Sequence, residues 1–164
     1  MIFLSVGTQF PFDRLVRAVD GAVAAGQLAE PVLAQVGEKS WRPAHMEWTA
    51  RLAPEEFEAR TAQASALIGH AGVGLISRAL ALGRPLLVVP RRKDLGEHVN
   101  DHQVELAARF AEAGHLLCAA EVSELGDRLG ALASFRPVPR EPQLEPLIAR
   151  LAGFFAGLRP GAGG

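Results

Sequence analysis

The sequence has a single cysteine, no tyrosine and only two lysines among its 17 basic residues. The lone Cys118 excludes a disulfide within the chain. No uncharged apolar run approaches the ~20 residues needed to cross a bilayer, and no basic segment marks a signal peptide at the start. A formal net charge of −1 argues against a nucleic-acid-binding protein with a strongly basic surface. We therefore expect a cytoplasmic protein; if it works at a membrane, another molecule must hold it there.

The length of 164 residues, 49% of them hydrophobic, fits one domain with a covered central sheet. It is too short for the two full nucleotide-fold domains of a typical sugar-transferring or dehydrogenase enzyme. Apolar runs alternate with helical patterns along the chain, which predicts an α/β protein with a parallel sheet. Strands are expected at residues 1–6, 32–36, 46–49, 66–68, 85–89 and 115–118. Helices are expected from residues 12 and 54, and over residues 75–82, 97–113 and 122–132.

The C-terminal part has a different composition. Residues 1–135 form the expected domain, and residues 136–145 contain three prolines, which favours an extended linker. A final helix is expected over residues 146–159, with one broad apolar face. Packing on the domain's own sheet is the common fate of such a helix. The alternative is docking on a partner subunit or at a membrane surface, and direct membrane binding is the weaker option because the segment has few basic residues.

Two glycine-rich loops are predicted to meet at one edge of the sheet. In open α/β sheets, ligands bind at the carboxyl ends of the strands where the strand order reverses. With a strand order of 3-2-1-4-5-6, the loops at that reversal are residues 7–11 and 70–74. Close backbone approach and helix N-termini suit a phosphate group, whereas the alternative is that these glycines serve only turns and packing. Neither GxxxxGK[ST] nor GxGxxG is present, which disfavours ordinary NTPase and dinucleotide sites.

A third polar segment follows the predicted strand at residues 85–89. Arg91, Arg92 and Lys93 come first, and the next helix is expected to open with Glu97, His98, Asn100, His102 and Gln103. We expect this segment to line the same crevice, although Arg92 and Lys93 also fit a solvated loop. The spacing of His98 and His102 could hold a metal, but no third ligand is evident. Hydrogen bonding to a polyhydroxyl ligand, or helix capping, is favoured instead.

Four ordered motifs resemble the C-terminal domain of family 28 glycosyltransferases. They are Ser-Val-Gly-Thr-Gln at residues 5–9, His-Ala-Gly-Val-Gly at 70–74, Ala-Leu-Gly-Arg-Pro at 81–85 with Val-Val-Pro-Arg at 88–91, and Gly-Glu-His-Val-Asn-Asp-His-Gln at 96–103. Spread over residues 1 to about 120, they are similar to single-domain subunits of two-component enzymes. One such group is the soluble subunit of the UDP-GlcNAc transferase of asparagine-linked glycosylation. Another is the small subunit of bacterial exopolysaccharide transferases, including the glucuronosyltransferase type.

This resemblance implies the C-terminal half of a GT-B fold, with a Rossmann-like parallel sheet and helices on both faces. It implies a donor-binding subunit that transfers a sugar from a UDP-sugar to a polyprenyl-diphosphate-linked saccharide, with inversion. A membrane-anchored partner would bind the lipid-linked acceptor and supply the catalytic base, so no catalytic residue is assigned in this chain. No Asp-x-Asp pair is present, and no metal or other cofactor is expected.

The resemblance also implies roles for individual residues. The first motif would lie near the diphosphate or the sugar through Gly7, Thr8 and Gln9. The second motif would place a helix N-terminus against the diphosphate; its residues are His70, Ala71, Gly72, Val73 and Gly74. Arg91 would offset the diphosphate charge. The donor sugar hydroxyls would be contacted by Glu97, His98 and Asn100, with Gln103 one turn further.

Two positions depart from the family pattern. Many relatives carry Thr or Ser where this chain has Leu75, and a ribose-binding Glu where it has Arg78. Arg78 cannot accept hydrogen bonds from ribose hydroxyls, but it could pair with the diphosphate or with an acidic sugar such as glucuronate. The segment around Glu47 and Trp48 is a further candidate to approach the uracil. The alternative function is a non-catalytic nucleotide-sugar-binding module that stabilises or regulates a membrane partner.

Overall fold

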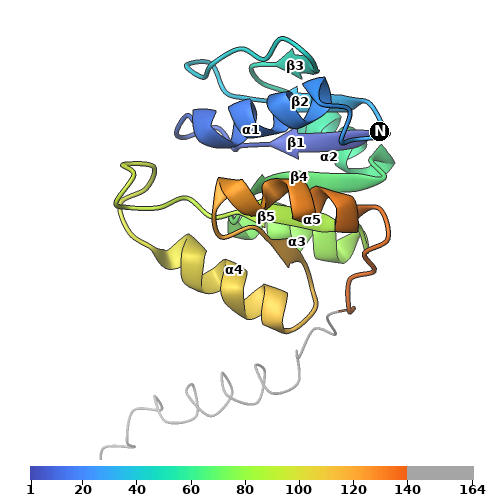
Figure 1. Ribbon diagram of the computed structural model, residues 1–164, viewed down its shortest axis with the longest axis vertical. Helices are drawn as coiled ribbons and strands as arrows, with labels where there is room; N and C mark the ends of the chain where they lie inside the picture. Colours follow the sequence, from blue (N-terminus) through green and yellow to red (C-terminus); the bar gives the residue numbers. More distant parts are fainter. Residues whose placement is uncertain (140–164) are drawn as a thin grey trace, which may run out of the picture.

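A computed structural model describes residues 1–139 of the chain. Its centre is a sheet of six strands that are all parallel, in the order β3-β2-β1-β4-β5-β6 (Figure 1). The predicted strand order is therefore confirmed. The strands are β1 (Ile2–Ser5), β2 (Val32–Gln35), β3 (Glu47–Thr49), β4 (Ala66–His70), β5 (Leu86–Val89) and β6 (Leu117–Cys118).

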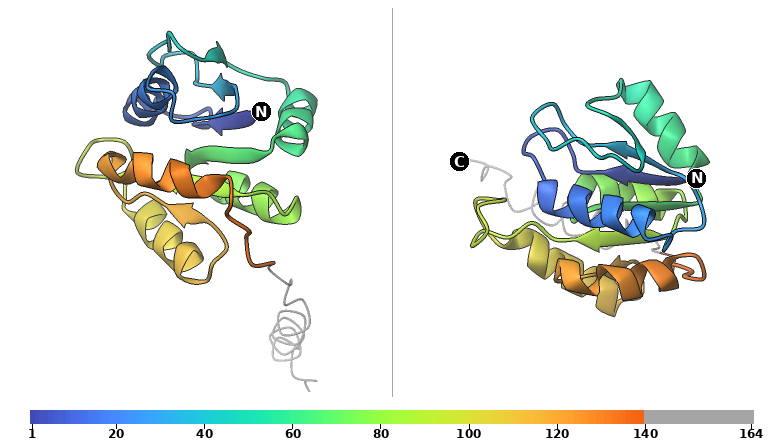
Figure 2. Two further views of the ribbon diagram at one scale, coloured as in Figure 1. Left: turned by 45° about the vertical axis from the view of Figure 1, so that its right-hand side comes forward. Right: turned by 45° about the horizontal axis from the view of Figure 1, so that its top comes forward.

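Helices cover both faces of this sheet, as predicted (Figure 2). They are α1 (Asp13–Ala24), α2 (Pro54–Gln63), α3 (Val73–Ala81), α4 (His102–Glu112) and α5 (Leu125–Leu132), the last preceded by a short 3-10 helix at Val122–Glu124. Helices α1 and α5 pack on one face, and α2, α3 and α4 pack on the other. The layers are those of a Rossmann-like α/β domain.

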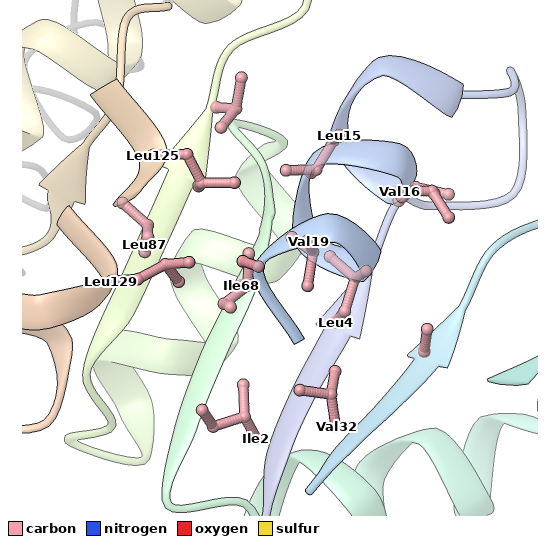
Figure 3. Packing of buried hydrophobic residues seen from close by; sticks show 14 of the residues in the cluster. Ile2, Leu4, Leu15, Val16, Val19, Val32, Ile68, Leu87, Leu125 and Leu129 are labelled. Atoms are coloured by element: carbon pink, nitrogen blue, oxygen red, sulfur yellow. The ribbon is translucent and has the colours of Figure 1, made fainter. Parts of the chain in front are cut away.

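Alternation along the strands divides the core into two apolar clusters. Leu4 and Ile68 face α1 and α5, whereas their neighbours Phe3 and Leu67 face α2, α3 and α4. Successive strand residues point to opposite faces, so a sheet covered on both sides needs continuous apolar runs. Figure 3 shows side chains of α1 and α5 meeting those of the central strands in the first cluster. Burial of each large aliphatic side chain contributes about 1.5–3 kcal/mol.

The contact of α3 with the sheet depends on Gly69, which pairs with Ser5 in the β1–β4 ladder. A β-carbon at Gly69 would lie 2.3 Å from Leu75 Cδ2 and 2.5 Å from the Ser5 carbonyl oxygen. Only a residue without a side chain lets Leu75 close over the sheet here. This close approach brings the start of α3 to the carboxyl ends of β1 and β4.

The predicted boundaries are wrong in two places near the carboxyl edge. The helix expected over residues 97–113 begins at His102, because Gly96 has a φ of +69° and the Asp101 carboxylate accepts a hydrogen bond from the Lys93 N–H at 2.9 Å. These contacts fold residues 90–101 into a loop, so His98 and His102 do not lie on one helix. The helix expected from residue 75 begins at Val73, with Gly72 at its N-cap.

The end of the predicted domain lies near the limit of the described residues. Helix α5 ends at Leu132, and residues 135–139 contain no helix or strand. Most of the predicted linker (136–145) and the whole predicted helix at 146–159 lie outside the described residues. Within residues 1–139, none of the helices has both the length and the apolar character required to span a bilayer.

We predict that Gly69→Ala lowers the free energy of unfolding by about 1–3 kcal/mol, because the added methyl group must displace Leu75 or the Ser5 backbone. Gly130→Ala is the matched control, since the space around Gly130 in α5 is open. It should raise stability by up to about 1 kcal/mol through helix propensity. Urea denaturation of both variants measures the difference, and equal stability of the two would contradict this account of α3 packing.

Candidate functional site

The two glycine-rich loops meet around the imidazole of His70, at the carboxyl ends of β1 and β4. A β-carbon at Gly7 would lie 3.0 Å from His70 Cε1, and one at Gly72 would lie 2.4 Å from His70 Nε2. Gly7 also has a φ of +78°, in the left-handed region that favours glycine. The ring therefore lies between two backbone segments that only glycine allows so close. His70 Nδ1 is 3.5 Å from the Ser5 carbonyl oxygen.

His70 is neutral at pH 7 in this environment. Burial lowers its pKa to about 4, and the nearby charge of Arg91 acts in the same direction, whereas the contact with the Ser5 carbonyl opposes it. A neutral imidazole adds no positive charge to the site. Attraction for an anion must then come from backbone amides and helix ends.

Most of the predicted site residues line one pocket of about 440 Å³ at this edge. They are Gly7, Thr8, Gln9, His70, Ala71, Gly72, Val73, Gly74, Arg91, His98 and Gln103. The structure thus brings together three segments that are far apart in the sequence. Val73 and Gly74, expected in the loop, are the first two residues of α3. No side chain caps this end of α3, which favours anion binding by its first N–H groups.

A larger pocket of about 760 Å³ adjoins the first and shares Gly7, Thr8, His70 and Gly74 with it. Arg78 lines this second pocket. Its guanidinium donates hydrogen bonds to Thr61 Oγ1 at 3.1 Å and to the Glu58 carbonyl at 3.0 Å. Lining residues that the sequence analysis missed are Ser5, Gln35, Arg51, Leu52, Ala53, Pro54, Phe57 and Glu58.

Ser5 and Gln35 are the last residues of β1 and β2, whereas the other missed residues follow β3 and begin α2. The segment singled out from the sequence, Glu47 and Trp48, lies inside the edge strand β3 and lines neither pocket. The next residues do, because a parallel strand delivers its following loop to the carboxyl edge. Pro54 at the start of a helix was the available signal. A third, smaller pocket of about 240 Å³ lies between Thr8 and Arg51. The three pockets adjoin one another at the carboxyl edge of the sheet, and together they are called the trough.

Arg91, predicted to offset the diphosphate charge, lines this pocket but directs its guanidinium at the protein. Its side chain is buried, and it donates hydrogen bonds to the carbonyl oxygens of Val6, Phe10 and Pro11 at 2.6–2.8 Å. The guanidinium also lies over the ring of Phe12, 4.6 Å from its centre. These donors hold the protein's own backbone and are not directed at a ligand.

Glu97 also has a protein partner. Its carboxylate forms a bidentate ion pair with Arg14 at 2.7 and 2.9 Å, and it accepts the backbone N–H of Arg92 at 3.1 Å. Glu97 lies outside the pocket that contains His98. Its predicted contact with sugar hydroxyls is untested, but this geometry gives it the role of anchoring the β5–α4 loop to α1.

The other polar residues of the β5–α4 loop are more accessible. His98 Nδ1 lies 3.1 Å from Asn100 Oδ1, and its ring packs near the exposed Phe10 at a centroid distance of 6.5 Å. Gln103, by contrast, is buried at the start of α4; its Oε1 accepts the Arg91 backbone N–H at 3.2 Å, and the residue lines the same pocket as His98. Among residues 1–139, no three His, Cys, Asp or Glu side chains are gathered as a metal-binding group.

Comparison with known proteins identifies this arrangement of loops. The model of the glycosyltransferase family 28 C-terminal domain matches residues 1–149, which includes both glycine-rich loops and the β5–α4 loop. The chain belongs to this family. Over 85 residues it is 36% identical to the UDP-N-acetylglucosamine transferase subunit ALG13 of Mus musculus, a match that covers 47% of this chain and 7% of the mouse protein. The chain thus corresponds to a small part of that relative.

Solved structures support the fold of a family 28 C-terminal domain. The glycotransferase of kitacinnamycin superposes with a TM-score of 0.59 at 21% identity, covering 96% of this chain and 39% of that one. An NMR structure of ALG13 gives a TM-score of 0.58 at 18% identity and covers 92% and 93% of the two chains. The glycosyltransferase VinC, solved with dTDP, gives 0.55 at 19% identity, covering 96% and 37%. The expected C-terminal half of a GT-B fold is confirmed.

We predict that His70 makes the stability of this domain depend on pH. Between about pH 6.5 and pH 4, the unfolded chain binds a proton at this residue that the folded chain does not bind. The free energy of unfolding should therefore fall by about 3 kcal/mol as the pH is lowered through this window. In His70→Asn this contribution is absent, so the stability difference between wild type and variant should shrink toward pH 4. Urea denaturation from pH 7.5 to 4.5 measures it, and a difference that stays constant with pH would contradict the prediction.

Proposed function

We propose that this glycosyltransferase domain is the donor-binding subunit of an inverting transferase in polysaccharide biosynthesis. The donor is a UDP-sugar, and the acceptor is a saccharide linked to polyprenyl diphosphate. The observation that carries the proposal is the meeting of the two glycine-rich loops and the uncapped start of α3 around His70. The relative ALG13, described as a subunit of a UDP-N-acetylglucosamine transferase, supports both the donor class and the need for a partner.

The pockets suggest how the donor lies along the trough. We assign the diphosphate to the boundary shared by the two larger pockets, where Gly7, Thr8 and Gly74 line both. Backbone amides of α3 and of the β1–α1 loop would face its oxygens there. The nucleoside then occupies the 760 Å³ pocket beside Leu52 and Phe57. The sugar occupies the 440 Å³ pocket, near His98.

Arg78 lines the nucleoside side of this boundary, one helical turn after Gly74. Its location supports pairing with the diphosphate more than pairing with the carboxylate of an acidic sugar, which would lie in the other pocket. Hydrogen bonds from Arg78 to Thr61 and Glu58 limit its reach. A glucuronosyl donor is therefore compatible with the site, but its carboxylate would be recognised from the His98 side.

In the proposed reaction, the acceptor hydroxyl oxygen attacks the anomeric carbon from the face opposite UDP. The bond from that carbon to the diphosphate oxygen breaks, and UDP leaves with the electron pair. The acceptor proton passes to a base on the partner subunit, so inversion needs no covalent intermediate in this chain. The α3 N-terminus and the loop amides would stabilise the charge that develops on the diphosphate.

Exposed apolar side chains on the segments that line the sugar pocket, here called the apolar rim, favour a partner subunit. Phe10, Val73, Leu95 and Val99 come from three different segments, and each is 49–74% exposed. The β5–α4 loop that carries Leu95 and Val99 projects from the carboxyl edge of the sheet (Figure 1). We infer that a membrane-anchored, acceptor-binding partner covers this rim. Such a partner would hold the chain at the inner face of the membrane, and the predicted helix at 146–159 is a second candidate contact.

A non-catalytic nucleotide-sugar-binding module is the second candidate function. It is favoured by the departures at Leu75 and Arg78, since Leu75 is buried and offers no hydroxyl to a ligand. A module of this kind would bind a partner, and even a UDP-sugar, without supporting transfer. Transfer assays with the assembled pair separate the two functions.

We predict that the purified chain binds UDP in isothermal titration calorimetry and that Gly72→Ala lowers this affinity by about tenfold or more. The added methyl group would lie 2.4 Å from His70 Nε2 and would push the imidazole or the α3 N-cap from its place. Gly130→Ala, in open space on α5, is the matched control and should bind like wild type. Absence of UDP binding by the wild-type chain, both alone and with its partner, would refute the donor-binding function. Loss of sugar transfer in Gly72→Ala with the complex intact would favour the enzyme over the module.

We predict that Val99→Glu weakens assembly with the membrane-anchored partner by about tenfold, because it buries a charge in an apolar contact. Val99 is 74% exposed, so the variant should fold normally and still bind UDP. Val138→Glu is the control: Val138 is also exposed but packs beside Gly114, at the opposite end of α4. Co-purification of the co-expressed pair measures assembly. Equal recovery of the partner with both variants would place the interface elsewhere.

A further inference from the structure

Arg91 is a buried cation whose three shortest side-chain hydrogen bonds go to backbone carbonyl groups of the β1–α1 loop, and a longer one, at 3.4 Å, goes to the Glu97 carbonyl. The residue is 3% exposed. Its Nη2 donates to the carbonyl oxygens of Val6 at 2.8 Å and Phe10 at 2.6 Å, and its Nη1 donates to that of Pro11 at 2.7 Å. These three carbonyls flank Thr8 and Gln9, at the tip of the β1–α1 loop.

This loop has little else to hold it. Residues 8–11 form no backbone-to-backbone hydrogen bond, and the first such bonds after Val6 are those from Leu15 and Val16 to the Phe12 carbonyl. Gly7 contributes only a long contact, 3.5 Å from its N–H to Ser5 Oγ. The side chains of residues 8–11 are exposed. The Arg91 guanidinium is therefore the main connection between the loop tip and the sheet.

No carboxylate forms an ion pair with Arg91 among residues 1–139. The charge of Glu97 is nearby, but its carboxylate is occupied by Arg14. Burial accordingly lowers the pKa of Arg91, and Glu97 only partly opposes this effect. A buried guanidinium in such surroundings must be solvated by carbonyl dipoles, which gives each of these hydrogen bonds a large energetic consequence.

The support behind Arg91 is itself well anchored. Its backbone N–H donates to Gln103 Oε1 at 3.2 Å, and Gln103 is buried at the start of α4. Arg14 of α1 donates to the Pro90 carbonyl at 3.1 Å and holds Glu97 in its bidentate pair. The guanidinium thus extends from a fixed backbone into a loop that lacks bonds of its own.

We propose that Arg91 is a positioning residue that holds the Thr8–Gln9 loop in the conformation that binds the donor, without touching the diphosphate. The proposal rests on the donor-binding function, in which this loop contacts the diphosphate. Positioning and direct phosphate binding predict different partners for the Arg91 guanidinium when the ligand is bound. The partners are the loop carbonyls in the first case and the phosphate in the second.

The test compares Arg91→Met and Arg91→Lys with two matched controls. Arg92→Met removes the neighbouring arginine, which pairs with Asp94 and Glu121 outside the pockets. Arg84→Met removes another partly buried arginine, which donates to the Ala62 carbonyl at the opposite edge of the sheet. For each variant, UDP affinity is measured by calorimetry, and hydrogen exchange of residues 7–12 is followed by NMR or mass spectrometry.

We expect Arg91→Met to weaken UDP binding by about tenfold or more and to speed exchange in residues 7–12, while exchange in β4 and β5 changes little. Arg91→Lys should recover part of both effects, since an ammonium group can reach some of the three carbonyls. Both controls should leave affinity and loop exchange as in wild type. Wild-type affinity in a folded Arg91→Met variant, or affinity lost without faster loop exchange, would overturn the proposal.

A measurement on the wild-type chain keeps the proposal testable if Arg91→Met does not fold. The guanidinium resonances of a ¹⁵N-arginine-labelled sample are recorded with and without UDP. Slowly exchanging Arg91 Nη protons that persist through the titration are expected from carbonyl contacts that do not change. A large UDP-dependent shift with loss of those contacts would show direct phosphate binding and would refute positioning. If wild type binds no UDP, the donor-binding function fails, whereas the effect of Arg91 on loop exchange still tests its structural part.

Discussion

The arrangement of the site depends on how closely two backbone segments approach the ring of His70. With a side chain at Gly7 or Gly72, the imidazole could not stay where it is. With a side chain at Gly69, Leu75 could not close over the sheet, and α3 would move away from the carboxyl edge. Close packing at these glycines therefore places the start of α3, the β1–α1 loop and the end of β4 within one trough. The proposed contacts with the diphosphate follow from that placement.

Three arginine side chains in and around this site make their hydrogen bonds within the protein. Arg91, Arg14 and Arg78 all donate hydrogen bonds within the protein, and His70 is neutral. In the proposed function, attraction for a diphosphate comes mainly from the amides at the start of α3 and in the β1–α1 loop. Such dipoles, oriented before a ligand arrives, need little rearrangement when charge develops on a leaving group. Of the three arginines, Arg91 is the one that holds the β1–α1 loop.

In the proposed function the trough binds the donor, and exposed apolar side chains lie on the segments that line it. A ligand that fills the two larger pockets would contact residues of four loops, but the rim formed by Phe10, Val73, Leu95 and Val99 would stay open to solvent. Burial of such a rim is a common source of binding energy between subunits. In the proposed function, this chain orients the nucleotide-sugar, and a partner supplies the acceptor and the base.

The sequence by itself determined the parallel sheet, its strand order and the family, because hydrophobic runs and glycine motifs are local signals that a covered sheet requires. The sequence also predicted that most residues of the 440 Å³ pocket lie together. Tertiary structure decided what the charged side chains do. Arg91 and Glu97 were predicted to contact the ligand. In the structure, Arg91 donates to backbone carbonyls 80 to 85 positions away in the chain, and Glu97 pairs with Arg14, 83 positions away. Tertiary structure also decided where α4 begins, through the turn at Gly96. It decided which residues after β3 line the pocket, through the register of this edge strand. Side chains with several donors can satisfy many partners, and only the packed fold selects among them.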